Sequence, residues 1–346
     1  MNYYLIKGNF RVIGYSPDGD SLMFEASNKK NWKKIVTIHQ DIFDAKLKAG
    51  KGIVQLRMQG VDALETHYSP SPVGGPSKLK TKKRRGTEKP KMGKFRQPKK
   101  FGDLAIDKMM GMFGVKTMNW GRSGWGGSYV KNIDIRKSRK TTNYKTKHKE
   151  PLEGYIVVND VERKGRPVSW VFAGKTSVRD GSKLSVTKLK GMLKKSANYK
   201  LLADGLVYPY FFFTLQAKLR DVLMDGVLKA QKKKLNIWMD DRTAKGLTMN
   251  RFSQITGEDI IFPYLFRRMI KHQYLRMMEG YWNALEKRKN YKPKSDALFL
   301  DTFFDDTNPY VFVIDERDFR RLDSIVQITK NKIKMTTHPG NIVFLG

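Results

Sequence analysis

Three observations predict that this chain folds as a mixed α+β protein. Apolar and polar residues alternate in several short segments, which is the pattern of half-buried strands. The turn-forming run at 16–20 separates the first two of these segments, as in a hairpin. Further along the chain, apolar residues recur every three or four positions, as on one face of a helix. The predicted strands are 3–14, 21–26, 52–60, 152–159 and 168–173, and the predicted helices are 101–115, 183–204 and 214–234.

Two of the predicted helices carry an apolar face that we expect to pack in the core. The face of the first contains Leu104, Met109, Met112 and Phe113, and that of the second contains Leu215, Leu219, Leu223 and Val227. Methionine on such a face more often fills space in a core than forms a special surface.

The chain is strongly basic, with 68 lysine and arginine residues against 33 acidic residues and a net charge of +35. Such a field attracts polyanions and favours fast, salt-sensitive association. Nucleic acid is therefore the expected partner, and anionic membrane surfaces are the second candidate. The chain contains no cysteine, which excludes thiolate metal sites and cysteine nucleophiles.

The sequence predicts a soluble intracellular protein. No run of eighteen apolar residues occurs, so we expect no transmembrane helix. The first sixteen residues lack the charged-then-apolar order of a signal peptide.

Two basic segments are predicted to be insertions. Residues 69–100 begin with a run rich in Pro, Gly and Ser and continue into a run of cations that includes Lys82, Lys83, Arg84 and Arg85. This segment suits contact with a phosphate backbone better than it suits a disordered loop without a target. Residues 116–150 are rich in Gly and are predicted to be irregular. Their aromatic residues Trp120, Trp125 and Tyr129 could either stack on bases or pack on the domain.

Charged residues in three separated segments together offer the chemistry of phosphodiester cleavage. Asp20 follows the first turn, Arg57, Asp62 and Glu65 lie along and after the strand 52–60, and Arg166 precedes a later strand. Carboxylates bind hard divalent cations through oxygen, and a further carboxylate can orient or deprotonate water. Arginines neutralise charge that grows on phosphate oxygens. Taken alone, the pattern R-x-x-x-x-D-x-x-E is more typical of an edge strand with a solvated salt bridge.

Four motifs follow one another in a fixed order along residues 1–240. They are DGDS (18–21), LRMQGVDALE (56–65), DVERKGRPVSWVF (160–172), and ADGLVYPY (203–210) followed by LKAQKKKLNIW (228–238). This set resembles the thermonuclease family, of which staphylococcal nuclease is the familiar member. The resemblance implies a five-stranded OB-fold-type β-barrel with packed helices. Residues 241–346 lie outside it, and we expect a small α/β accessory region of unknown role there, where a protein or nucleoprotein partner could bind.

The resemblance implies a metal site. Asp20 and Asp62 correspond to the aspartates that bind Ca²⁺ in the family, and the backbone carbonyl of Ala63 corresponds to a further ligand. Asp18 is expected near the metal, acting on it through water. Another divalent cation could take the place of calcium.

The resemblance also implies catalytic and substrate-binding residues. Glu65 corresponds to the glutamate that acts as general base or positions the attacking water. Arg57 and Arg166 correspond to the two arginines that bind the scissile phosphate. Tyr208 and Tyr210 resemble tyrosines that contact the nucleotide, although their spacing differs from that of the family.

The implied activity is that of a calcium-dependent endonuclease that cleaves DNA, with RNA as a second candidate substrate, and with little sequence specificity. Two positions depart from the family pattern: Ser21 replaces threonine, and Leu64 replaces proline, which predicts a less rigid turn before Glu65. The alternative is a non-catalytic nucleic-acid-binding or scaffold protein that reuses the barrel. The retained aspartates, glutamate and arginines favour the nuclease.

Overall fold

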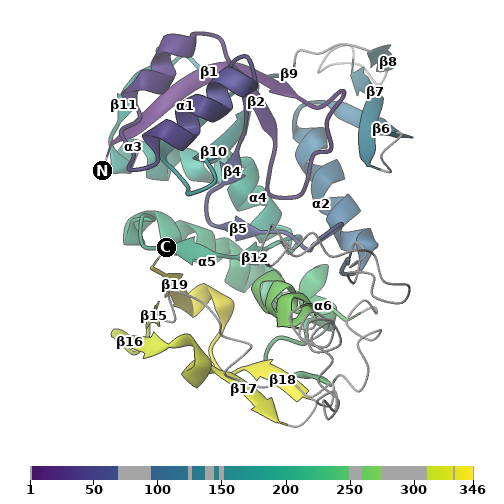
Figure 1. Ribbon diagram of the computed structural model, residues 1–346, viewed down its shortest axis with the longest axis vertical. Coiled ribbons are helices and arrows are strands. Elements are labelled where there is room, and N and C mark those ends of the chain that lie inside the picture. The colour runs from purple at the N-terminus through teal and green to yellow at the C-terminus, as the bar shows by residue number, and fades with distance from the viewer. Residues whose placement is uncertain are drawn as a thin grey trace, which may run out of the picture. The chain divides into compact units, whose positions relative to one another are not determined.

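The computed structural model (Figure 1) divides the chain into two compact units. The first unit contains Met1–Ala63 and Lys100–Met239, and the second contains Leu64–Lys99 and Asp240–Gly346. The later boundary falls beside residue 240, where the sequence predicts one, whereas residues 64–99 group with the second unit. The structure describes residues 2–68, 95–123, 127–136, 144–147, 152–248, 259–272, 274, 310–329 and 332–345.

The first unit is built on a curled sheet, a half-barrel with the strand order β3-β2-β1-β9-β10-β4. Its neighbouring strands run antiparallel, except that β10 and β4 are parallel. A short strand, β11 (Lys183–Leu184), pairs with the start of β1. The main strands are β1 (Tyr3–Arg11), β2 (Met23–Ala26), β3 (Ile53–Gln55), β4 (Arg57–Met58), β9 (Leu152–Val161) and β10 (Pro167–Ala173). Each predicted strand is confirmed, with 52–60 divided into β3 and β4.

The burial of the strands follows their positions in the sheet. On β2, buried and half-buried residues alternate, as expected of a strand with one face in the core. β9 lies between β1 and β10 and is buried along almost its whole length. Its apolar run at 155–158 is therefore the pattern of a strand covered on both faces.

Helices pack around this sheet. They are α1 (Gln40–Ala49), α2 (Lys99–Met112), α3 (Val186–Met192), α4 (Ala197–Ala203), α5 (Ala217–Lys232) and α6 (Ile237–Asp240), with the 3-10 turns η1 (Lys29–Lys34) and η2 (Leu193–Lys195). The predicted helix 183–204 is divided because the Ser196 hydroxyl accepts a hydrogen bond from the backbone N–H of Tyr199 and starts α4. The predicted apolar residues of α5 are all buried, as is Leu215, which lies two residues before the helix.

The predicted apolar face of α2 is confirmed at Met109 but wrong at Leu104. Gly102, Ala105, Ile106, Met109 and Met110 face the core, whereas Leu104 is 37% exposed. The buried set has the spacing of one helical face and includes small residues, which allow close approach. A Cβ added at Gly19 would lie 3.1 Å from that of Ala105, so the first turn of the chain packs directly on this face.

The prediction that residues 116–150 are irregular is also wrong. The described part forms an antiparallel sheet of β6 (Val115–Arg122), β7 (Ser128–Arg136) and β8 (Tyr144–Lys147). Polar cross-strand contacts obscured it in the sequence, among them Asn119 to Asn132 at 2.6 Å and Thr146 to Asp134 at 2.7 Å. Trp120 is 42% exposed in this sheet, and Trp125 lies outside the described residues.

Within its described residues, the second unit contains two small sheets and a helix. The sheets have the strand orders β14-β18-β17 and β19-β15-β16. Residues 263–272 are helical. The strands are β14 (Leu247–Thr248), β15 (Tyr310–Val313), β16 (Asp318–Arg321), β17 (Val326–Thr329), β18 (Lys332–Met335) and β19 (Ile342–Phe344). No helix in the described part of the chain is long and apolar enough to cross a membrane.

A single buried side chain, that of Asn198 on α4, joins three backbone segments of the first unit. Its amide nitrogen donates to the carbonyl oxygens of Gln59 at 2.9 Å and Ser169 at 3.1 Å. Its amide oxygen accepts from the backbone N–H of Val171 at 2.9 Å. Asn198 is 0% exposed, so water cannot replace these bonds. The end of β4 is thereby fixed to β10 and to α4.

Replacing Asn198 with alanine should therefore destabilise the first unit. Three buried backbone groups would each lose a partner, and we expect a loss of about 3 kcal/mol or more in the free energy of unfolding. Urea denaturation followed by tryptophan fluorescence measures this loss. Asn119→Ala, which removes one bond between exposed side chains, should cost less than about 0.5 kcal/mol. Equal effects of the two substitutions would contradict the role assigned to Asn198.

Candidate functional site

Arg57 lies on a strand that is held on both sides. On one side, the backbone N–H groups of Leu56 and Met58 donate to the carbonyl oxygens of Leu22 at 2.7 Å and Asp20 at 2.9 Å. On the other side, β4 pairs in parallel with β10, with Arg57 opposite Val168. The strand that carries Arg57 therefore runs between the Asp20 segment and the start of β10.

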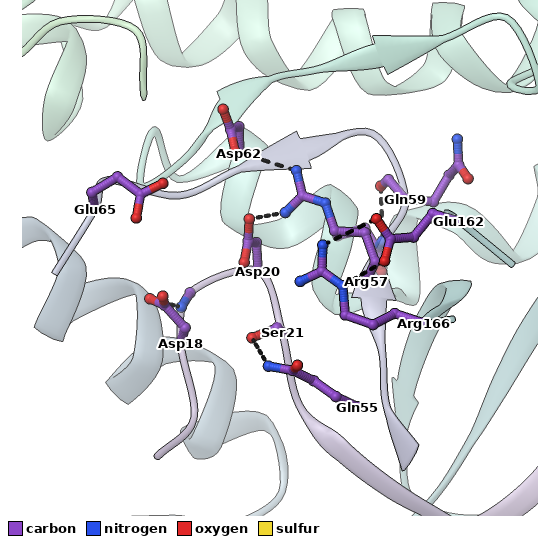
Figure 2. A network of polar contacts seen from close by, with 12 residues as sticks. Asp18, Asp20, Ser21, Gln55, Arg57, Gln59, Asp62, Glu65, Glu162 and Arg166 are labelled. Atoms are coloured by element: carbon purple, nitrogen blue, oxygen red, sulfur yellow. Dashed lines mark hydrogen bonds and ion pairs between the residues drawn. The ribbon is translucent and has the colours of Figure 1, made fainter. Parts of the chain in front are cut away.

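The guanidinium group of Arg57 joins two carboxylates (Figure 2). Its Nη1 donates to Oδ2 of Asp20, and its Nη2 donates to Oδ1 of Asp62 at 3.2 Å. Asp62 is almost completely buried, and the side chains of Arg57 and Asp20 are 14% and 15% exposed. The ring of Tyr210 lies under the same guanidinium group, with its centroid 5.7 Å from Cζ. The predicted residues Asp20, Arg57, Asp62 and Tyr210 are thus brought together.

A tight turn presents Asp20. The backbones of Asp18 and Ser21 are hydrogen-bonded to each other, at 3.2 Å and 3.4 Å, and the carboxylate of Asp18 accepts from the N–H of Gly19 at 2.8 Å. A Cβ added at Gly19 would lie 2.7 Å from that of Ala63. Any larger residue would push this turn away from Ala63, which follows the strand β5 (Val61–Asp62).

Asp62 is positioned by a reversal of the chain at Gly60, which has a φ of +77°. β5 (Val61–Asp62) then pairs with β12 (Tyr208–Pro209), with Asp62 opposite Tyr208. The N–H of Tyr210 donates to the carbonyl oxygen of Gly60 at 3.1 Å. This pairing explains why Tyr208 is fully buried against Trp238, with ring centroids 5.0 Å apart, while Tyr210 reaches Arg57.

Arg166 enters β10 from a turn at Gly165, whose φ is +74°. Its guanidinium group binds both carboxylate oxygens of Glu162, with Nε to Oε1 at 2.8 Å and Nη2 to Oε2 at 3.3 Å. Arg166 immediately precedes β10 and comes two residues before Val168, which pairs with Arg57, so it lies at the start of the strand beside that of Arg57. Both arginines belong to one end of the same pair of strands (Figure 2).

Glu162 was not predicted as a site residue, although it lies within the motif DVERKGRPVSWVF (160–172). Burial alone would raise its pKa, but the hydrogen bond and charge of Arg166, together with the charges of Lys164 and Arg57, lower the pKa below its ordinary value overall. Glu162 is therefore the carboxylate that fixes Arg166. The signal in the sequence was its spacing of four residues from Arg166 across a glycine turn.

Glu65 belongs to the second unit, because the boundary between the units passes between Ala63 and Leu64. There, Nη1 of Arg267 donates to Oε1 of Glu65 at 2.7 Å. Sequence reasoning missed Arg267, which is 202 residues away and belongs to no motif. The basic residues Lys82, Lys83, Arg84 and Arg85 lie outside the described residues.

The side chains at Arg57 suit a hard divalent cation in their chemistry, since Asp20 and Asp62 supply carboxylate oxygens from two segments. Across the described ranges, no group of three or more His, Cys, Asp or Glu side chains is close enough to hold a metal ion. A cation bound by Asp20 and Asp62 would therefore need further ligands from backbone carbonyls, water or substrate.

No protein-family model matches this chain, and no curated protein matches its sequence. The assignment of a function to this site consequently depends on its own residues.

The lowered pKa of Glu162 predicts how its contribution depends on pH. As the pH falls, Glu162 takes up a proton in the unfolded state at its ordinary pKa, and in the folded state only at a lower pH. The stabilisation from the Arg166 pair is therefore present at neutral pH and is lost as the pH falls through the lowered pKa of the folded state. Glu162→Gln should therefore be less stable than the unaltered chain at pH 7, and this difference should shrink below about pH 4.5. Urea denaturation between pH 3 and pH 7 measures it.

Glu153→Gln is the matched control for this prediction. Glu153 is 54% exposed and lies 3.8 Å from Lys175, so its substitution should change stability by less than about 0.5 kcal/mol at any pH. A Glu162→Gln deficit that stays constant from pH 7 to pH 3 would show that Glu162 contributes by packing instead of charge.

Proposed function

We propose that this protein is a metal-dependent phosphodiesterase, a nuclease that cleaves DNA, with RNA as the second candidate substrate, and that calcium is its cation. The observation that carries the proposal is the guanidinium group of Arg57 between the carboxylates of Asp20 and Asp62, with a second carboxylate-bound arginine, Arg166, at the start of the neighbouring strand. In this proposal the curled sheet is the OB-type barrel of the thermonuclease family.

The charge balance of the site supports this substrate class. Asp20, Asp62 and Glu162 with Arg57 and Arg166 leave one net negative charge in a site of low exposure. A divalent cation would reverse that charge to one net positive, and a phosphodiester carries the single negative charge that balances it. Cation and phosphodiester together therefore leave the site neutral, which favours their joint binding.

Each residue then has a definite role. The bound cation would polarise a phosphate oxygen and make a bound water more acidic. Arg57 and Arg166 turn their N–H groups to the phosphate oxygens and stabilise the charge that develops on them. Glu65 accepts the proton of the water that attacks phosphorus in line, as the P–O bond on the opposite side breaks and the leaving oxygen takes a proton from solvent.

The position of Glu65 in this scheme rests on chain connectivity. Glu65 follows Asp62 by three residues, so their Cα atoms are at most about 11 Å apart however the units are arranged. A glutamate side chain adds several more ångströms of reach. This connectivity supports the role proposed for Glu65.

Asp62→Asn should abolish cleavage while largely retaining binding. Loss of a metal ligand should lower kcat by about 100-fold or more, because the cation that stabilises the transition state is lost. The Kd for a DNA duplex should change less than about threefold, because most affinity comes from phosphate contacts spread over a large basic surface. Cleavage of a fluorescent oligonucleotide with Ca²⁺, Mg²⁺ or chelator, and fluorescence anisotropy, measure the two effects.

Asp221→Asn on α5 is the matched control, since it makes the same charge change at an exposed position. It should leave cleavage unaltered. Undiminished cutting by Asp62→Asn would remove Asp62 from the cation site. Duplex binding without cleavage by the unaltered protein, in every cation tried, would favour the non-catalytic binding protein instead.

Cleavage should also fall steeply with salt. With a net charge of +35, substrate capture releases counterions from the nucleic acid, so kcat/KM should decrease by about tenfold or more between 50 and 200 mM KCl. The rate on bis(p-nitrophenyl) phosphate, which has no polymer backbone, serves as the control and should change little. A flat salt dependence on DNA would mean that the basic segments do not contact substrate.

A further inference from the structure

The residues around Glu65 form a small ribbon within the second unit. Tyr68 and Phe95 exchange two backbone hydrogen bonds, at 2.7 and 2.8 Å, and the N–H of Gln97 donates to the carbonyl oxygen of Glu65 at 2.8 Å. The two ends of the segment that leaves the first unit after Ala63 are thus joined to each other. The Tyr68 ring also packs edge-on against Phe266, with centroids 6.4 Å apart.

The side chain of Gln97 fixes this ribbon to the C-terminal region. Its Oε1 accepts from the backbone N–H of Glu65 at 3.1 Å, and its Nε2 donates to the carbonyl oxygen of Ile261 at 2.6 Å. Gln97 is 2% exposed, so these bonds are protected from water. The backbone N–H and the carbonyl oxygen of Glu65 therefore both bond to Gln97. Gln97 is itself held by Ile261, two residues before the helix at 263–272.

Arg267 contacts the carboxylate of the same residue. It lies on the helix next to Phe266, and its Nη1 donates to Oε1 of Glu65 at 2.7 Å. The two side chains remain 24% and 19% exposed. Solvent therefore still reaches the carboxylate, as a group that works on water requires.

We infer that Arg267 and Gln97 are positioning residues for Glu65, so that the C-terminal region supplies the orientation of the carboxylate that acts on water. This inference rests on the proposed function. Leu64, where the family has proline, is almost completely buried, and the rigidity that proline would give to this turn comes instead from Gln97 and Arg267.

Steady-state cleavage of a fluorescent single-stranded oligonucleotide by the full chain tests this inference. Arg267→Ala should lower kcat by about 10- to 100-fold with KM within about twofold, because an orienting contact and not substrate binding is lost. Arg267→Lys, which keeps a cation of similar reach, should recover much of the loss. In a Glu65→Gln background, Arg267→Ala should have almost no further effect on kcat, because the residue it orients is already inactive.

Arg242→Ala is the control within the same unit. Arg242 is 52% exposed, and its Nε lies 3.7 Å from Oδ1 of Asp259. Its substitution therefore removes the same charge as Arg267→Ala without touching Glu65. It should leave kcat unaltered. An Arg267→Ala variant with unchanged or higher kcat would overturn the inference, and so would an equal loss in the Glu65→Gln background.

Amide hydrogen exchange separates this inference from the proposed function. In Arg267→Ala and Gln97→Ala, the peptide covering residues 61–68 should exchange at least about fivefold faster than in the unaltered chain and in Arg242→Ala. This result would support the positioning role even if the protein cleaved no phosphodiester. Unchanged exchange of this peptide in both variants would overturn the positioning role, whatever the activity.

Discussion

The ion pairs of Arg57 are the contacts on which the rest of the first unit's site depends. Asp62 has almost no exposure, and an ionised carboxylate there without a cationic partner would cost several kcal/mol. Arg57 supplies that partner and holds Asp20 with its other terminal nitrogen. The backbone must then bring three segments within reach of one guanidinium group. The positive φ of Gly60, the close approach at Gly19 and the three hydrogen bonds of Asn198 all satisfy that requirement.

Both arginines of the site are held by carboxylates before any ligand arrives. Arg166 is bound through two nitrogens by Glu162, and Arg57 is bound by two aspartates and covered by Tyr210. A long side chain held in this way has already lost most of its rotamer freedom, so binding an anion costs less entropy. The same carboxylates oppose an anion until a cation offsets them. In the proposed function, affinity for a phosphodiester would therefore depend on the presence of a divalent ion.

The sequence predicted those parts of the fold in which one physical pattern dominates. The strand β2 and the helix α5 have regular apolar periods, because one face of each is buried. The sheet β6-β7-β8 was missed because contacts such as Asn119 to Asn132 hold polar side chains across an exposed sheet, where no apolar period marks the strands. Asp20, Arg57 and Asp62 were predicted from residue type and order. Glu162 and Gln97 were not, since they act by holding other residues, and Arg267 is too far along the chain for any local pattern to connect it with Glu65.

The two units are interleaved in the sequence, and this bears on the order in which a growing chain can fold. The first unit has all its residues once Met239 has been made, including Asp20, Arg57, Asp62 and Arg166. Segment 64–99, by contrast, has been made long before Ile261 and Arg267, with which its residues pair. During synthesis from the N-terminus, the segment that contains Glu65 must wait for the last third of the chain before it acquires its contacts with Ile261 and Arg267. A nascent chain therefore holds Arg57 and Arg166 in their ion pairs well before Arg267 is available to Glu65.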